Sequence, residues 1–117
     1  MNTQTIVRQG GKLPNGTDRR LSAVFKALGD TTRFRIFRLL IDQPQISVSA
    51  IAKVLHLSAP LTSQHIKILV HAQLLEKQRT GKRIYSRPVR TNPVVRDLIR
   101  TIQKSIKTEP IISHTTA

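Results

Sequence analysis

The positive charge of the chain is densest over residues 76–90, which hold six Lys or Arg side chains and one acid. Such cations bind phosphate oxygens and other clustered anions through charge-assisted hydrogen bonds. A run of charge is more often a solvated surface, but this run coincides with a hairpin pattern around Thr80-Gly81. We therefore predict that the segment binds a polyanion, through Lys77, Arg79, Lys82, Arg83 and Arg87.

A second group of polar side chains lies at helical spacing over residues 59–72. Three residues at i, i+4 and i+7 predict its buried seam: Thr62, Ile66 and Leu69. That seam turns three polar residues outward, toward a base edge or a phosphate: Ser63, Gln64 and Lys67. His65 lies next to Ile66, so the pattern leaves both packing and binding open for it.

Catalytic and metal-binding patterns are missing from the sequence. The chain has no cysteine, which excludes disulfides, thiolate zinc sites and iron–sulfur clusters. We find no paired carboxylates, no nucleophile with a supporting base and no phosphate-binding glycine loop. The four histidines show no ligand spacing. We predict that the protein is not an enzyme and uses no cofactor and no metal.

The elements that position these side chains belong to one small domain. The chain has 117 residues, with 20 Lys and Arg against six Asp and Glu, and a formal net charge of +14. We expect a flexible basic arm over residues 1–16, a folded domain over 17–107 and a disordered tail over 108–117. No apolar run approaches the ~20 residues of a membrane span, and the start lacks a secretory core. A soluble intracellular protein without a membrane partner is expected.

Four helices are predicted before the basic segment. The first begins at Asn15 or Thr17 and ends before Gly29, which suits the C′ position. Helices over 31–41, 48–56 and 59–72 follow, with N-caps Asp30, Ser47 and Ser58. The inward side of the second is predicted to hold Phe34, Phe37, Leu40 and Ile41.

A hairpin and a last helix follow. Strands are predicted over 74–79 and 82–87, with Thr80-Gly81 as the turn and Pro88 as the end. Asn92-Pro93 then opens a helix that runs to about Lys107. This helix carries one apolar stripe: Val95, Leu98, Ile99, Ile102 and Ile106.

The fold class is thus mainly α with a small β-hairpin, in the order of a winged helix-turn-helix. Two short helices joined by a brief turn, with a polar second helix and a basic hairpin behind it, are typical of this architecture. A helix fits the major groove of B-DNA, and a basic hairpin can lie along the phosphates or enter the minor groove. Double-stranded DNA is therefore the predicted partner.

Three segments resemble one family in the same order. Residues 27–36, ALGDTTRFRI, look like the opening of ArsR/SmtB-type repressors. Residues 57–69, LSAPLTSQHIKIL, are similar to their recognition helix, and residues 77–85, KQRTGKRIY, to their wing. The resemblance spans roughly residues 20 to 106. It implies a prokaryotic, cytoplasmic, nucleoid-associated repressor that binds an imperfect palindrome as a homodimer.

The resemblance also implies roles for single residues. Ser63, Gln64 and His65 match the base-facing positions, and Lys67 and the wing cations match phosphate contacts. The first and last helices would form the dimer interface, through Leu21, Val24, Phe25, Val95, Leu98, Ile99, Ile102 and Ile106.

Three positions depart from the family pattern. Ala59 replaces a common Gln, which removes one base-reading amide from the DNA-binding face. Leu61 faces outward on the same helix and could meet a thymine methyl group or flank the core. Gln73 stands where the family usually has Gly. Either a left-handed backbone strains Gln73 by about 1 kcal/mol, or the helix ends differently here.

The family's metal sites are not matched. Ser47-Val48-Ser49 stands at the position of a Cys-x-Cys motif, and hydroxyls are poor replacements for thiolates. On the last helix, Asp97 matches one ligand, but Ile99, Pro110 and Ser113 do not match the others. The effector is therefore unknown. Two alternatives remain open: a basic architectural or RNA-associated protein that reads no bases, and a winged helix that binds a protein partner through its last helix.

Overall fold

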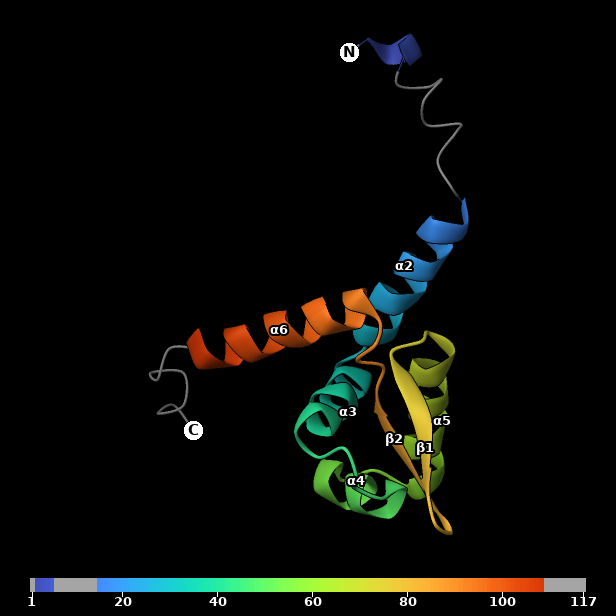
Figure 1. Ribbon diagram of the computed structural model, residues 1–117, viewed down its shortest axis with the longest axis vertical. Helices are drawn as coiled ribbons and strands as arrows, with labels where there is room; N and C mark the ends of the chain where they lie inside the picture. The colour runs from blue at the N-terminus through green and yellow to red at the C-terminus, as the bar shows by residue number, and fades with distance from the viewer. Residues whose placement is uncertain (1, 6–14, 109–117) are drawn as a thin grey trace.

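The structure is a computed structural model that describes residues 2–5 and 15–108. Four helices lead into an antiparallel hairpin, and a long helix follows it (Figure 1). The elements are α2 (Asn15–Leu28), α3 (Thr31–Asp42), α4 (Val48–Leu55), α5 (Ala59–His71), β1 (Leu75–Thr80), β2 (Arg83–Pro88) and α6 (Pro93–Thr108). The predicted fold class, mainly α with one small hairpin, is confirmed.

The predicted helix starts are confirmed by their caps. The Asp30 carboxylate accepts a hydrogen bond from the Arg33 backbone N–H at 2.9 Å and begins α3. Ser47 and Ser58 cap α4 and α5 in the same way, at 3.1 and 3.2 Å. The Asn92 side chain accepts from the Val94 N–H at 2.9 Å and begins α6. Each cap gives a partner to an N–H group that the helix itself leaves unpaired.

A residue with a left-handed backbone follows each of the helices α4 and α5. His56 has φ 57° and Gln73 has φ 63°, so neither position is occupied by the glycine that this geometry favours. The next N–H folds back onto each helix, from Leu57 to the Ala52 carbonyl and from Leu74 to the Leu69 carbonyl. The sequence left open a left-handed Gln73 or a different end of the helix, and the structure has the left-handed residue.

Gly29 follows α2 as predicted, but for a different reason. Its φ is not positive, and its N–H donates to the Phe25 carbonyl at 2.8 Å. A Cβ at this position would lie 3.2 Å from that carbonyl oxygen. The residue is thus suited by its lack of a side chain in a tight helix-to-helix turn rather than by a left-handed backbone.

The core is built around α3. Ile36, Phe37 and Leu40 are fully buried, and side chains from every other described helix and from the start of β1 pack around them. Each such side chain contributes roughly 1.5–3 kcal/mol on burial. Of the predicted inward residues, Phe37, Leu40 and Ile41 are buried, and Phe34 is partly buried and packs against the same core, to which Ile36 also belongs.

The hairpin has an exact register. Leu75 pairs with Pro88, and Thr80 pairs with Arg83 across a two-residue turn. The turn is therefore Gly81-Lys82 and not the predicted Thr80-Gly81. Gly81 has φ 62°, which glycine tolerates at the first position of such turns. Pro88 is the last residue of β2, as predicted, and is fully buried.

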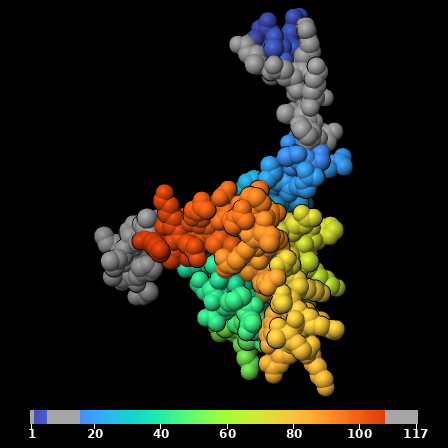
Figure 2. All heavy atoms as spheres, in the orientation of Figure 1, coloured from blue at the N-terminus to red at the C-terminus, as the bar shows by residue number. Residues whose placement is uncertain are grey.

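The two terminal helices extend away from the compact part of the fold. Figure 1 shows α2 and α6 meeting near the top of α3 and then diverging, and Figure 2 shows both as projections from the body. The arm and tail predicted for 1–16 and 108–117 fall mostly outside the described residues. Within them, residues 3–5 form one helical turn, while residues 15, 16 and 108 belong to α2 and α6. None of the described helices is long and apolar enough to cross a membrane.

Candidate nucleic-acid interface

The outward face of α5 carries the polar residues that the sequence places there. The seam residues Thr62, Ile66 and Leu69 are buried against the core. The Thr62 hydroxyl donates to the Ser58 carbonyl at 2.8 Å, which satisfies the one polar group in that seam. On the exposed side lie Ala59, Leu61, Ser63, Gln64 and Lys67. The helix therefore presents a short polar surface with Lys67 as its one cation before His71.

His65 lies at the edge of this surface. Its side chain is half-buried, and its Nδ1 atom is buried without a hydrogen-bond partner among the described residues. It faces the start of α3, where the pKa of Asp30 is lowered by the Arg33 N–H and the Arg33 guanidinium and, to a smaller degree, by His65. A packing role against α3 accounts for this position, and the exposed edge of the ring leaves contact with a ligand open.

The wing distributes its cations over two faces. Successive side chains of a strand alternate in direction, so the register separates the five residues. Lys77 and Arg79 share the face of Leu75 and Ser86, which are buried against the body. Arg83 and Arg87 lie on the opposite face, and Lys82 is in the turn. The five cations do not form one continuous surface.

The two cations of the outer face already have partners. Arg87 donates through Nε to the Glu76 carboxylate at 2.9 Å, across the strand pair. Arg83 hydrogen-bonds with the Tyr85 side chain two residues away, and this bond raises the pKa of its guanidinium. Arg87 is therefore the wing cation whose charge is most nearly neutralised within the protein, whereas Arg83 keeps its full charge.

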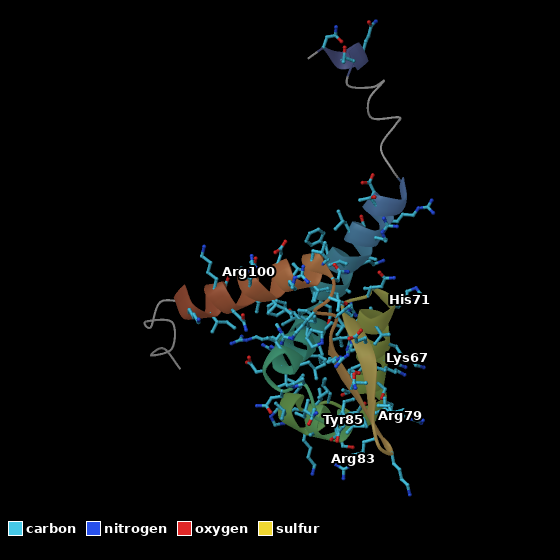
Figure 3. All side chains as sticks on the ribbon, viewed as in Figure 1. Lys67, His71, Arg79, Arg83, Tyr85 and Arg100 are labelled. Carbon is cyan, nitrogen blue, oxygen red and sulfur yellow. The ribbon has the colours of Figure 1, made fainter. Side chains whose placement is uncertain are left out.

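The inner face of the wing continues onto α5. Lys77 lines a shallow hollow with Lys67 and His71, over an apolar floor of Ile68 and Val70. Figure 3 shows Lys67 and His71 on one side of the molecule, with Arg79 on the same side and farther along the wing. Neither His71 nor Ile68 was predicted from the sequence to belong to this surface. His71 could have been found, because it follows Lys67 by four residues and so shares its helix face, whereas Ile68 follows Lys67 directly and offers no such signal.

The eight predicted interface residues separate into two groups by burial. Val24, Val95, Ile99 and Ile102 are buried inside the protomer, where they belong to its own core. Leu98 is half-buried, and Leu21, Phe25 and Ile106 are exposed. Phe25 is 62% exposed, an unusual amount for this residue type in a folded domain. Only the second group offers apolar surface to another molecule.

No group of three or more His, Asp or Glu side chains gathers within residues 2–5 and 15–108 in a way that could hold a metal. His114, Pro110 and Ser113 lie outside that part of the chain. The absence of a metal site in the whole protein stays a prediction.

Comparisons with known proteins agree with this geometry. A family described as winged helix-turn-helix DNA-binding matches residues 29–76. The cadmium resistance transcriptional regulatory protein CadC of Listeria innocua is 30% identical over 80 residues, which are 68% of this chain and 67% of that protein. The transcriptional repressor SdpR of Bacillus subtilis is 35% identical over 65 residues, 56% of this chain and 71% of that one.

A solved structure is similar over most of the fold. It is the homodimeric winged helix-turn-helix DNA-binding domain of Mb0332 from Mycobacterium bovis, a possible ArsR-family transcriptional regulator. The two share 26% identity with a TM-score of 0.68, over 82% of this chain and 86% of that one.

Proposed function

The chain belongs to the ArsR family of winged helix-turn-helix, DNA-binding transcriptional regulators, and from this premise we propose that it is a repressor that binds an imperfect palindrome as a homodimer. The observation that carries the proposal is the pairing of two unlike surfaces. A helix with exposed Ser63 and Gln64 stands beside a hairpin with Arg79, Lys82 and Arg83 at its far end.

The proposed division of labour follows from the chemistry of these groups. Gln64 carries an amide that can donate to and accept from a base edge, and Ser63 can do so through one hydroxyl. The wing cations and Lys67 contact phosphates, which fix the register of the protein on the duplex without reading sequence. Leu61 and Ala59 offer small apolar contacts, and His65 contributes at the edge of the helix. Binding by the wing is expected to be strongly salt-dependent.

The proposed homodimer is supported by the exposed apolar residues of α2 and α6. Leu21, Phe25 and Ile106 lie on the two helices that project from the body. Two recognition helices are needed to read two half-sites about 34 Å apart, and a two-fold dimer supplies them. The homodimeric M. bovis domain has the same fold. A dimer bound to its operator would exclude other proteins from that DNA, which supports repression. The similar protein SdpR is named a transcriptional repressor, which also supports this role.

A negative charge introduced into the proposed interface tests the dimer. We expect Phe25→Glu and Leu98→Glu to convert the protein to a monomer in sedimentation and to abolish binding to a palindrome. Phe25 is far more exposed than Leu98, so its substitution spares the core and separates dissociation from unfolding. Gln103→Glu, on the exposed side of α6, is the matched control and should stay dimeric. A wild-type protein that sediments as a monomer would refute the homodimer.

A second candidate function is favoured by the charge of the chain. With a net charge of +14 and cations on both faces of the wing, the protein could bind nucleic acid through the backbone alone, as an architectural or RNA-associated protein. The two candidates differ in one quantity, the ratio of affinities for a selected and a scrambled duplex. A repressor requires a ratio far above one, whereas the architectural protein requires a ratio near one.

A further inference from the structure

A hollow of about 500 Å³ lies where three elements of the fold meet. One wall is the N-terminal half of α2, another is the C-terminal end of α5, and the third is the start of α6. This volume is within the range of pockets that hold small organic ligands. The hollow is separate from the DNA-binding surface described above, apart from His71, which contributes to both.

The chemistry of the lining is apolar below and cationic at the edge. Val24, Ala72 and Val95 form a buried floor, and Leu21 and Val94 rise beside it, about two-fifths exposed. Arg19, Arg20 and His71 stand among the residues at the rim. None of the described residues that line the hollow is acidic. A ligand that fits must therefore bury an apolar body and place an anionic group near the rim.

We propose that this hollow binds an amphipathic organic anion, a carboxylate on an aromatic or aliphatic body, as the effector of the protein. The carboxylate pairs with the Arg20 guanidinium, which in the free protein makes one long bond, 3.4 Å, to the Thr17 hydroxyl. The apolar body covers Val24, Val94 and Val95. Arginine suits this role because its planar group can hold both oxygens of a carboxylate.

The position of the hollow connects the ligand to DNA binding. This regulatory role of the ligand rests on the proposed function. The ligand contacts the end of the recognition helix at His71 and Gln73, and it contacts α2 and α6, the two helices of the proposed dimer. Gln73 is the left-handed residue at which α5 ends, so the chain there already carries strain. A ligand that prefers one arrangement of these helices shifts the protein toward it, and the factor by which the ligand changes the affinity for DNA equals the factor by which DNA changes the affinity for the ligand.

The test measures ligand binding first without DNA. The probe is 2-naphthoate, and its neutral partner is 2-acetylnaphthalene, both titrated into the full chain by calorimetry. We expect the carboxylate to bind at least about tenfold more tightly than the neutral analogue, a factor that corresponds to about 1.4 kcal/mol. Arg20→Gln should remove that difference, and Val94→Trp should remove binding of both probes. Arg38→Gln, an exposed arginine on α3 outside the hollow, should bind both like the wild type.

Three results would overturn the proposal. They are no binding of 2-naphthoate, unchanged preference in Arg20→Gln, and unchanged binding in a folded Val94→Trp. A fourth is binding to the monomeric Leu98→Glu variant but not to the wild type, because the partner subunit would then fill the hollow. Addition of 2-naphthoate to the protein–DNA complex tests the coupling, with altered affinity expected. Loss of specific DNA binding would refute the proposed repressor but leave the outcome of the ligand titration intact.

Discussion

The recognition helix and the wing stand next to each other but use opposite chemistry. The exposed side of α5 is short and nearly neutral, with Ser63 and Gln64 ahead of Lys67. The hairpin carries five cations, and its backbone turns at a glycine. The backbone of α5 instead enters after left-handed His56 and leaves through left-handed Gln73. The helix is thus bounded by left-handed residues other than glycine, whereas the hairpin turns at a glycine.

The contrast between a nearly neutral helix surface and a cationic hairpin shows why net charge is a poor guide to sequence specificity in such a protein. Most of the affinity for DNA comes from phosphates, which every sequence offers. Discrimination comes from the few groups that reach base edges, and in the proposed function these are Ser63 and Gln64, which carry no charge. The net charge of +14 therefore bears on the overall affinity for DNA and says little about sequence specificity.

The greatest loss of affinity should follow removal of the three wing cations that make no ion pair with another described residue. We expect the triple substitution Arg79→Ala, Lys82→Ala and Arg83→Ala to weaken binding to all duplexes alike, on the order of a hundredfold at moderate salt. The slope of log affinity against log salt should fall by about 0.9 for each lost phosphate contact. Arg87→Ala is the comparison variant: because Glu76 already pairs with Arg87, its removal should weaken binding less than removal of Arg79. Equal losses from Arg79→Ala and Arg87→Ala would show that the two faces of the wing are not distinct.

Two substitutions on α5 should separate sequence preference from overall affinity. Gln64→Ala is expected to lower the discrimination between a selected operator and a point-mutated one by about 1–3 kcal/mol at the affected base pair. Lys67→Ala, three residues away on the same exposed side, should weaken all sequences by one common factor. Competition binding with paired duplexes measures both. If Gln64→Ala weakens all duplexes equally, the helix does not read bases.

The caps of the helices offer a comparison in pH dependence. Asp30 caps α3 with a carboxylate and Ser58 caps α5 with a hydroxyl, so only the first titrates. The pKa of Asp30 is lowered from 3.8, chiefly by the Arg33 N–H. Its contribution to folding is therefore complete above 3.8 and is lost as the pH falls through the lowered value.

Asp30→Ala should cost about 1 kcal/mol at neutral pH, as removal of an N-cap does. Asp30→Asn should keep the hydrogen bond to the Arg33 N–H. As the pH falls toward the lowered pKa of Asp30, the wild type should lose free energy of unfolding relative to this variant. Urea unfolding at pH 7 and at pH 3 measures both. If the difference in free energy of unfolding between the wild type and Asp30→Asn is the same at both pH values, the assigned cause of the pKa shift is wrong.

The smallest effect tests the strain at the ends of the helices. Gln73→Gly should stabilise the protein by about 0.5–1 kcal/mol, because glycine adopts the left-handed backbone without a Cβ clash. His56→Gly should do the same at the end of α4. Gly81→Ala should act in the opposite direction at the wing turn, where φ is 62°. Thermal unfolding of the three variants compares the regions directly, and a destabilising Gln73→Gly would refute the strain at that position.

What could be predicted from the sequence was local. Asp30, Ser47 and Ser58 were identified as caps because a cap depends on the three residues that follow it. The seam of α5 followed from periodicity, whereas the sequence left open whether Gln73 is left-handed or the helix ends differently. The turn of the wing was displaced by one residue, because register depends on how the hairpin packs against the body. The division of its cations between two faces follows from that register.

The apolar stripe of α6 shows the other limit. Val95 and Ile99 are buried in the protomer while Ile106 is exposed, yet all three belong to one stripe. Periodicity records which residues avoid water but not which molecule covers them. Half of the predicted interface is thus taken by the protomer's own core. Which surface remains for a partner could be known only from the packing.

A binding selection from random duplex DNA with the full chain tests most directly whether the protein binds a palindrome sequence-specifically as a dimer. The account predicts a two-fold-symmetric motif whose half-sites are separated by about one helical turn, because two copies of α5 must reach the major groove on one face of the duplex. Recovery of unenriched sequence, bound as tightly as any selected duplex, would contradict it and would assign the protein to backbone binding alone.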